Sequence, residues 1–486
     1  MHSTRTACST QASWAGPPVE TPEVRTDLSP EALASPDLAL SNDIIRTCVH
    51  CGICLSHCPT YQVRHDENDS PRGRIVLMRN MLEKGGTPDE MTVKHLDRCL
   101  SCLACEAICP SGVKYSKLIG QSREHIEAHY PRPAVQRGMR HLLAKLVPSP
   151  GLFRMALIAG RAARPMRSLF PGTLRAMLDA LPGHAARRPS AVDRPQVFPA
   201  QGPRRARVSM LSGCVQKVLE PGINEATIRL LQRHGVEVVV ARGAGCCGAL
   251  SDHMGMAEQA QPMMKANIEA WLREAGAGDS IDAIIINASG CGTAVKAYGH
   301  ALRHDPAWAE RAARVSALAK DVTEFMTDIG LNADLVRPER TASMRVVYHA
   351  PCSMQHGQHI VHQPLDLLRK AGFEVAEPPD SFMCCGSAGI YNLLQPEIAG
   401  ELKRRKAWSI RSVDAAVAAT GNIGCMTQLA DAVGIPFVHT VELLDWATGG
   451  PEPQALRGSK PPGSAQLEKA VSESASGPVA GSNPTI

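Results

Sequence analysis

The chain has 486 residues and 44% hydrophobic content, enough for two or three domains with sizeable cores. Its net charge is only +5. The positive charge is concentrated in residues 131–210, which contain fifteen Lys and Arg against two Asp, without interleaved aromatic residues. This pattern excludes a general nucleic-acid-binding protein. No apolar run reaches the roughly 18 residues that cross a bilayer. We therefore expect no transmembrane segment and a cytoplasmic protein, held at most at the inner face of the cell membrane through its partners.

Residues 1–26 are rich in Ser, Thr, Pro and Ala and have no hydrophobic period, which predicts a disordered N-terminal extension. Its single cysteine, Cys8, is interpreted as an idle thiol. The start of the chain does not read as a secretory signal, so we expect reduced thiols rather than disulfides.

Eight cysteines within residues 27–130 form two copies of one spacing, C-x2-C-x2-C-x3-C-P. This spacing is the ligand run of bacterial two-cluster ferredoxins, where two-residue gaps let three thiolates of one loop reach three corners of a [4Fe-4S] cube. We therefore predict a helical ferredoxin-type module that moves electrons. The two copies are Cys48, Cys51, Cys54 and Cys58 before Pro59, and Cys99, Cys102, Cys105 and Cys109 before Pro110.

The fourth ligand of each cluster must come from elsewhere, and in ferredoxins it is the Cys before Pro of the other run. A pair of zinc sites is the main alternative, because C-x2-C pairs also bind zinc. A zinc site, however, has no reason to repeat a third cysteine step and the final Cys-Pro. The predicted ligands are Cys48, Cys51, Cys54 and Cys109 for cluster 1, and Cys58, Cys99, Cys102 and Cys105 for cluster 2.

Residues 131–206 form a basic connector, rich in Pro and Arg. Two apolar stripes at helical spacing predict short helices that pack against the rest of the protein. A helix lying on a membrane surface would share this pattern, and docking onto an acidic partner subunit fits it equally well. The stripes are Met139, Leu142, Leu143 and Leu146, then Leu152, Phe153, Leu157 and Ile158.

The C-terminal half contains an internal repeat of its cysteines at offsets of 138, 138 and 134 residues. Three landmarks at nearly constant offset indicate two similar cysteine-rich domains, residues 207–335 and 343–446, related by an approximate two-fold arrangement. Residues 447–486 are predicted to be a disordered tail. The first copy has Cys214, Cys246-Cys247-Gly248 and Cys291, and the second has Cys352, Cys384-Cys385-Gly386 and Cys425.

Each copy alternates short apolar runs with helical stretches, which predicts βαβ-like domains and an overall α+β / α/β fold class. The cysteines follow directly after the predicted strands. Because ligands bind at the carboxyl ends of parallel strands, we expect the four cysteines of each copy to converge on one crevice. Strands are predicted at 208–211, 236–240, 281–287, 345–349, 373–375, 415–419 and 437–439, and helices at 224–233, 363–370 and 397–409.

Four converging thiols favour an additional metal site in each copy, holding a further cluster or zinc. Glycines beside each Cys-Cys pair allow the tight backbone that adjacent ligands require. Buried structural cysteines and a reactive dithiol are the alternatives. Four histidines near Cys352 could act as a ligand or proton carrier, and His349 is best placed because it ends a predicted strand. The others are His356, His359 and His362.

These features resemble the family of iron-sulfur subunits of bacterial glycolate oxidase, over about residues 27–446. The resemblance implies flavin-bearing partner subunits that oxidise glycolate to glyoxylate. This chain would pass the electrons through two [4Fe-4S] clusters toward a quinone or another membrane acceptor. No catalytic residue is assigned here, because no acid–base pair and no dinucleotide-binding motif presents itself. The resemblance is carried by Cys48–Cys54, Ser70–Arg74, Cys105–Gly112 and Thr420–Gln428.

One departure concerns the wider Cys-Cys-Gly domain of heterodisulfide reductases, which ends in C-x2-C. In this chain the position of the second cysteine, three residues after Cys291 and Cys425, is occupied by Ala294 and Gln428. Each repeat therefore lacks a fifth thiolate, and a smaller cluster, a zinc ion or an empty thiol pocket fits the pattern. Two alternatives stay open: an equivalent subunit of a D-lactate or anaerobic glycerol-3-phosphate dehydrogenase, and a thiol-disulfide enzyme of the heterodisulfide-reductase type.

Overall fold

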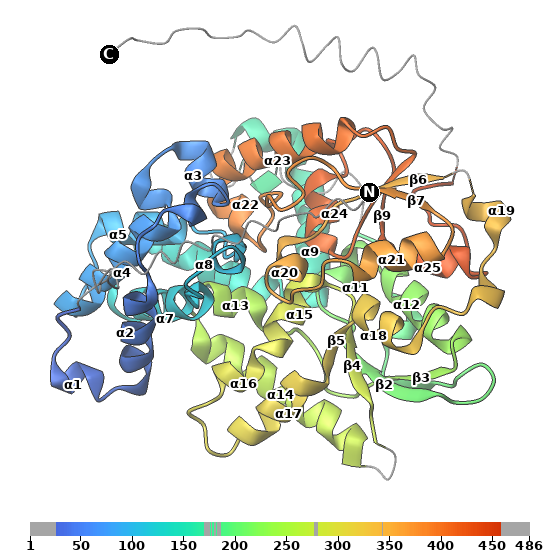
Figure 1. Cartoon of the computed structure of the whole chain (residues 1–486), viewed down its shortest axis with the longest axis horizontal. Helices are drawn as coiled ribbons and strands as arrows, with labels where there is room; N and C mark the ends of the chain where they lie inside the picture. The colour runs from blue at the N-terminus through green and yellow to red at the C-terminus, as the bar shows by residue number, and fades with distance from the viewer. Residues whose placement is uncertain are drawn as a thin grey trace, which may run out of the picture.

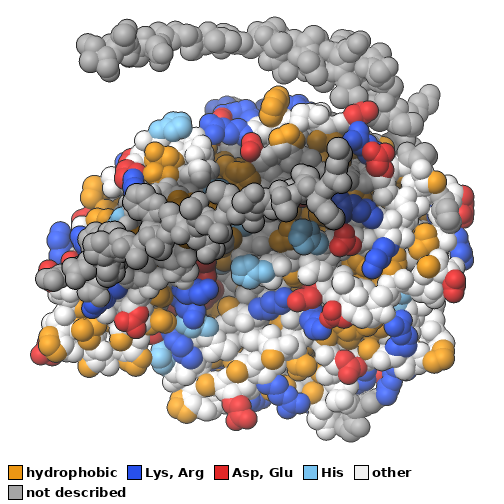
Figure 2. All heavy atoms as spheres, in the orientation of Figure 1, with side chains coloured by type: hydrophobic (Ala, Val, Ile, Leu, Met, Phe, Trp, Pro, Cys, Tyr) orange, Lys and Arg blue, Asp and Glu red, His pale blue; other side chains and the backbone are white. Residues whose placement is uncertain are grey.

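The computed structural model describes residues 26–457 except 170–174, 176, 179–180, 182–185, 277–279 and 343. A helical N-terminal module lies beside two domains that each contain a parallel sheet (Figure 1). This mixture of helices and parallel sheets confirms the predicted fold class. On the face shown in Figure 2, Lys and Arg side chains are interspersed with Asp and Glu. Residues 1–25 of the predicted disordered extension, Cys8 among them, lie outside the described residues.

Short helices build the N-terminal module around a core that includes Met78, Leu96 and Leu118, which are fully buried. Proline occupies the first turn of four of these helices, where its fixed φ and missing N–H are tolerated. Cys58 is the N-cap of α3, so the first Cys-Pro pair also starts a helix. The helices are α1 (Pro30–Leu33), α2 (Pro36–Thr47), α3 (Pro59–Arg64), α4 (Pro71–Lys84), α5 (Glu90–Asp97), α6 (Ala104–Ala107) and α7 (Tyr115–His129).

The basic connector contains α8 (Ala134–Leu146) and α9 (Pro150–Ala163), followed by the 3-10 helix η3 (Arg164–Leu169). As predicted, part of each apolar stripe packs inward, since Leu143 and Leu157 are buried. Leu142 and Ile158, in contrast, are 53% and 60% exposed, so packing within the protein accounts for only part of each stripe. Among the described helices, none alone is long and apolar enough to cross a membrane; only α8 together with residues 150–169 meets both criteria, and that pair is bent by 119°.

The two cysteine-rich domains have equivalent sheets. The strand order is β1-β3-β2-β4-β5 in the first and β7-β6-β8-β9 in the second, so the orders coincide once the edge strand β1 is set aside. β1 pairs antiparallel with β3 and lies in the predicted connector; the sequence pattern does not indicate it, because it is only three residues long and Pro199 follows it. The strands are β1 (Gln196–Phe198), β2 (Ala206–Met210), β3 (Val236–Val240), β4 (Ala283–Ile286), β5 (Ala319–Asp321), β6 (Arg345–Tyr348), β7 (Glu374–Ala376), β8 (Val417–Thr420) and β9 (Phe437–His439).

Helices pack reciprocally between the two domains. In the first domain the helices are α11 (Gln216–Leu219), α12 (Gly222–Arg233), α13 (Ala249–His253), α14 (Ala257–Gly276), α15 (Ser289–Lys296), α16 (Tyr298–Ala301), α17 (Ala309–Leu318) and α18 (Val322–Ile329). After α19 (Pro338–Thr341), the second has α20 (Cys352–Gln355), α21 (Gln363–Lys370), α22 (Tyr391–Leu394), α23 (Pro396–Arg411), α24 (Ile423–Leu429) and α25 (Thr440–Ala447). α12 packs on α25 and α18 packs on α21, as expected when equivalent elements meet across an approximate two-fold axis.

The N-terminal module docks on both domains. α7 lies against α13 of the first domain, and α3 lies against α23 of the second. Asp37 accepts a hydrogen bond from His304 Nε2 at 2.8 Å. On the other side, the Tyr391 hydroxyl donates to the carbonyl of Arg98 at 2.9 Å. The module is therefore held in a defined orientation toward both sets of repeated cysteines.

Gly255→Ala is expected to weaken this docking. Gly255 has a φ of +77°, and a Cβ atom there would lie 2.3 Å from the carbonyl oxygen of Arg123 in α7. Gly434→Ala is the matched control, because it has a φ of +74° and no atom within 4 Å of the added Cβ. Both variants carry about 1 kcal/mol of left-handed strain, but only Gly255→Ala should speed hydrogen exchange in α7 and α13. Equal exchange in the two variants would contradict the role of this contact.

The predicted disordered tail starts too early. Residues 448–457 belong to the described structure, and Leu456 is only 6% exposed, packed in the core shared by the two domains. The Arg457 guanidinium donates to the carbonyl of Glu452 at 3.0 Å. One buried leucine in a Pro- and Gly-rich stretch has no periodicity that reveals it in the sequence. Residues 458–486 lie outside the described structure.

Candidate functional site

A cavity in the N-terminal module is lined by cysteines of both runs. Cys58 of the first run meets Cys99, Cys102 and Cys105 of the second, and the remaining wall includes Arg74, Leu100 and Tyr115. Cys58, Cys99 and Cys102 are at most 9% exposed, so the cavity is shielded from water. The structure thus brings together the four thiols predicted for cluster 2, with one thiol crossing over from the other run.

The four cysteines predicted for cluster 1 lie nearer the surface. Cys51 is exposed, whereas Cys48, Cys54 and Cys109 are half-buried. Burial raises the pKa of Cys48, and the charges of Cys109 and Cys51 raise it further. Cys48 and Cys109, which belong to different runs, pack against the same hydrophobic core. Burial likewise raises the pKa of Cys54 to about 11. A nearby cation or metal ion would favour the thiolate forms of Cys48 and Cys54 against these shifts.

Arg74 is a buried cation beside the cluster 2 cavity. Its side chain is 1% exposed, donates from Nε to the His95 carbonyl at 2.8 Å and from Nη1 to Thr60 Oγ1 at 3.0 Å, and pairs with Asp69 at 3.3 Å. Nη1 also lies 3.8 Å from the sulfur of Cys58. Asp69 is fully buried and is held in addition by His95 and Arg98. The network fixes a guanidinium against a predicted cluster ligand.

The electrostatics of this cavity suit an anionic iron-sulfur cluster. Burial alone would raise the pKa of Cys99, but the guanidiniums of Arg74 and Arg123 outweigh it, and the pKa is lowered. The backbone N–H of Ser101 and the Tyr115 hydroxyl also donate to Cys99 Sγ, at 3.4 and 3.8 Å. Hydrogen bonds to ligand sulfur and local charge are the means by which proteins stabilise and tune such clusters. The residues present therefore fit the cofactor that the ferredoxin-type spacing implies.

The four cysteines of the first repeat converge as expected. The thiols of Cys214 and Cys247 lower the pKa of the neighbouring Cys246. Cys246, together with burial, raises the pKa of Cys214 well above its usual value. The thiols of Cys246 and Cys291 and burial likewise raise the pKa of Cys247. These thiols form one compact group at the carboxyl ends of β2, β3 and β4.

The four cysteines of the second repeat also converge. Cys352 Sγ lies 3.7 Å from Cys384 Sγ, and Cys385 Sγ lies 3.5 Å from Cys425 Sγ. Beside them, Lys406 is 2% exposed and donates to the Asp380 carbonyl at 2.6 Å. Burial lowers the pKa of Lys406, while the thiolate charges of Cys385 and Cys384 oppose that shift. The second repeat therefore carries a buried cation next to its sulfurs.

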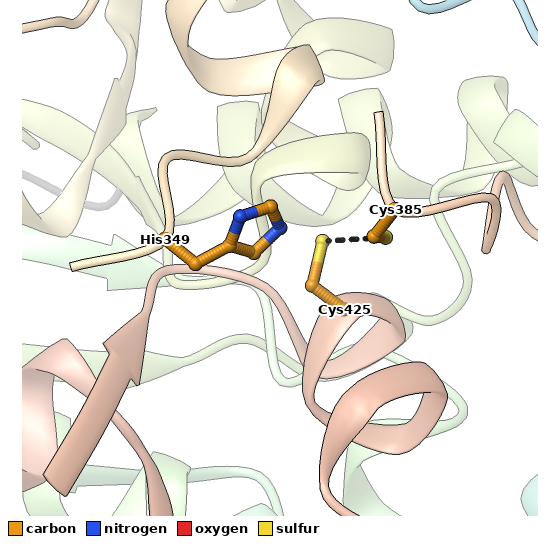
Figure 3. A group of neighbouring side chains, drawn as sticks. All are labelled: His349, Cys385 and Cys425. Atoms are coloured by element: carbon orange, nitrogen blue, oxygen red, sulfur yellow. Dashed lines mark hydrogen bonds between the residues drawn. The ribbon is translucent and has the colours of Figure 1, made fainter. Parts of the chain in front are cut away.

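His349 is the histidine that the structure brings to these thiols. It points toward Cys385 and Cys425, with donor atoms of the three residues within 4.8 Å of one another (Figure 3). Burial holds the pKa of His349 well below its usual range, and the charge of Lys406 adds to the effect. His356 instead contacts the Phe382 carbonyl at 2.9 Å. The remaining two predicted histidines, His359 and His362, are exposed.

Sequence reasoning missed the roles of Arg74 and Lys406. Each stands at a core-facing position of a helix: Arg74 is one turn before buried Met78, and Lys406 lies one turn from both Leu402 and Ile410. A charged residue inside an apolar helical stripe is the signal that could have identified them.

The cluster 2 cavity adjoins the second repeat directly. Leu100 and Cys102 pack with Cys384 and Tyr391 in one buried cluster, and Cys352 lies against it. Burial is the largest cause of the raised pKa of Cys102, and the charge of Cys352 raises it further. Two groups of cysteines that lie far apart in the sequence therefore form neighbouring sites.

Comparisons with known proteins support both halves of this arrangement. The family model of the 4Fe-4S dicluster domain matches residues 44–113, and that of the cysteine-rich domain matches twice, at 208–296 and 346–430, which confirms the duplication. The chain is 38% identical over 424 residues to the glycolate oxidase iron-sulfur subunit of Escherichia coli (strain K12), covering 87% of this chain and 99% of that protein.

Two further relatives differ in how much of this chain they cover. The probable glycolate oxidase iron-sulfur subunit of Bacillus subtilis (strain 168) is 33% identical over 425 residues, covering 83% of this chain and 94% of that protein. Lactate utilization protein A of Bacillus licheniformis is 25% identical over 245 residues, which is 49% of this chain and 99% of that protein. The likeness to the first two relatives therefore includes nearly the whole described structure, and the likeness to the third only half of the chain.

Proposed function

The chain belongs to the family of glycolate oxidase iron-sulfur subunits, and on that premise we propose that it is the electron-transferring subunit of a glycolate-oxidising complex. Oxidation of glycolate to glyoxylate releases two electrons and two protons, which we assign to flavin-bearing partner subunits. A quinone, which takes up two electrons and two protons, is the proposed final acceptor. When bound, the [4Fe-4S] clusters supply one-electron transfer between these two reactions.

The observation that carries this proposal is the exchange of cysteines between the two runs. Cys58 lies in the cavity with Cys99, Cys102 and Cys105, and Cys109 packs against the same core as Cys48, whose pKa its charge raises. Because each site takes a thiol from the other run, the two sites are held as neighbours. The cluster 1 site is at the surface and the cluster 2 site is buried, so the two clusters would carry electrons between the surface of the module and its interior.

We place the contact with the flavin-bearing partner at the surface site. Cys51 is exposed there, and the apolar side chains of Val49 and Ile53 in the same run, and of Ile108 next to Cys109, are 46%, 47% and 37% exposed. Apolar side chains grouped at a functional site are typical of protein contacts. A partner that covers them would exclude water from the four thiols and bring its own redox group close.

Glycolate is expected to reduce this chain within its native complex. Anaerobically isolated complex would be examined by low-temperature EPR before and after addition of glycolate, D-lactate or glycerol 3-phosphate, each in a separate sample. We expect the signal of reduced [4Fe-4S] clusters with glycolate alone. A signal with only D-lactate or glycerol 3-phosphate would keep the electron-transfer role and overturn the substrate. A complex whose clusters are reduced by dithionite but by none of the three substrates would overturn the proposed function.

A further inference from the structure

His349 has an unusual environment for a buried histidine. Its side chain is 1% exposed, and neither Nδ1 nor Nε2 has a hydrogen-bond partner. A buried polar group without a partner costs about 1–3 kcal/mol of folding free energy. The unpartnered ring nitrogens therefore indicate that His349 binds a ligand. The ring is directed at the sulfurs of Cys385 and Cys425 (Figure 3). A soft metal centre is the ligand chemistry that satisfies an imidazole nitrogen among thiolates.

We propose that the second repeat holds an iron-sulfur cluster for which Cys352, Cys384, Cys385 and Cys425 supply thiolates and His349 supplies a nitrogen ligand. His349 then takes the place of the fifth thiolate that this repeat lacks at Gln428. The donors lie close together: the sulfurs of Cys352 and Cys384 are 3.7 Å apart, those of Cys385 and Cys425 are 3.5 Å apart, and a ring nitrogen of His349 lies within 4.8 Å of the second pair.

Five donors favour a cluster over a zinc ion. A structural zinc ion is held by four ligands in a tetrahedron, so one ion leaves at least one of these buried donors unused. A centre with several irons can use all five. Histidine in place of cysteine is an established form of iron-sulfur ligation, and it raises the reduction potential relative to thiolate ligands.

The first repeat, which serves as an internal comparison, lacks these features. Leu211 stands three residues before Cys214, where His349 stands three residues before Cys352. Asn267 of the first repeat corresponds to the buried Lys406 of the second. In each repeat an alanine, Ala260 or Ala399, lies against the glycine of the Cys-Cys-Gly motif. Asn267 and Lys406 each stand seven residues after that alanine. Asn267 is neutral, and its side-chain amide donates to the carbonyl of Cys246 and to the Tyr298 hydroxyl. Only the second repeat combines a nitrogen donor with a buried cation that offsets thiolate charge.

The location of the second repeat also favours a redox cofactor. Cys384 packs in the same buried cluster as Cys102, a predicted ligand of cluster 2, and Cys352 borders it. A metal centre here is therefore a neighbour of cluster 2. Electrons that reach cluster 2 would meet this centre next.

The test uses the native complex carrying His349→Leu, His349→Cys or the control His359→Asn. Leucine reproduces the residue of the first repeat, cysteine restores a ligand, and His359 is exposed with a φ of +58° that asparagine tolerates. Iron, zinc and acid-labile sulfide would be counted per chain. Pulsed EPR of the dithionite-reduced protein, with and without ¹⁵N-histidine labelling, would show whether a histidine nitrogen is bound to the cluster.

We expect the wild type and His359→Asn to contain more iron than two cubane clusters and to show a histidine nitrogen coupling. His349→Leu should lose the additional iron and the coupling but keep the signals of clusters 1 and 2. His349→Cys should regain the iron without the coupling. Unchanged iron in His349→Leu, zinc in place of iron, or failure of His349→Cys to regain the metal would each overturn the proposal. None of these readouts uses glycolate, so they are independent of the proposed substrate.

Discussion

Cys102→Ser is expected to reduce glycolate-dependent electron delivery to an artificial acceptor by more than about 100-fold, the upper range of what disturbing the surroundings of a metal ligand costs. Serine does not ionise to replace a thiolate ligand, and Cys102 is only 9% exposed, so no solvent ligand can enter in its place. Iron and acid-labile sulfide should fall by one cluster per chain, and the EPR signal of cluster 1 should persist.

Cys51→Ser provides the companion measurement, because Cys51 lies in the exposed site. It should remove the signal of cluster 1 and leave that of cluster 2. Cys8→Ser is the control, since Cys8 has no second cysteine within 39 residues in the sequence and should change neither the iron content nor the rate. Normal electron delivery by both Cys102→Ser and Cys51→Ser would contradict the assignment of the two runs as electron carriers.

Arg74→Met should cause the second large effect, a loss of about 3 kcal/mol in the stability of the N-terminal module, since removing one partner of a buried ion pair costs roughly 3–5 kcal/mol. The substitution removes the donors to Thr60 and to the His95 carbonyl and leaves Asp69 with only part of its compensating charge. The thermal transition of the module in the intact complex should fall by about 10 °C.

Arg72→Met is the matched control for this experiment. Arg72 lies in the same Ser70–Arg74 stretch, but its ion pair with Glu67 is at the surface, where the two side chains are 33% and 46% exposed. Surface ion pairs of this kind contribute about 1 kcal/mol or less. Equal thermal shifts in Arg72→Met and Arg74→Met would show that the buried network is not critical.

Much of the fold was predictable because its signals are local. The strands at 236–240 and 437–439 and the helix at 363–370 have the predicted bounds, since each is a short apolar or amphipathic run between clear breaks. The edge strand β1 and the buried Leu456 were not predictable, because each is stabilised by a neighbour distant in the sequence rather than by its own pattern.

The sequence by itself determined which cysteines group together, because ligand runs and the offset between repeats are properties of spacing along the chain. It also determined that the repeated cysteines follow strands, so that a parallel sheet must collect them at one edge. Only the tertiary structure decided that Cys102 adjoins Cys384, that Arg74 and Lys406 lie buried beside sulfur, and that His349 rather than His356 reaches the thiols. These contacts arise where the N-terminal module, α4, α23 and the β6 strand end pack together, and the burial that gives each charge or ring its effect exists only after that packing.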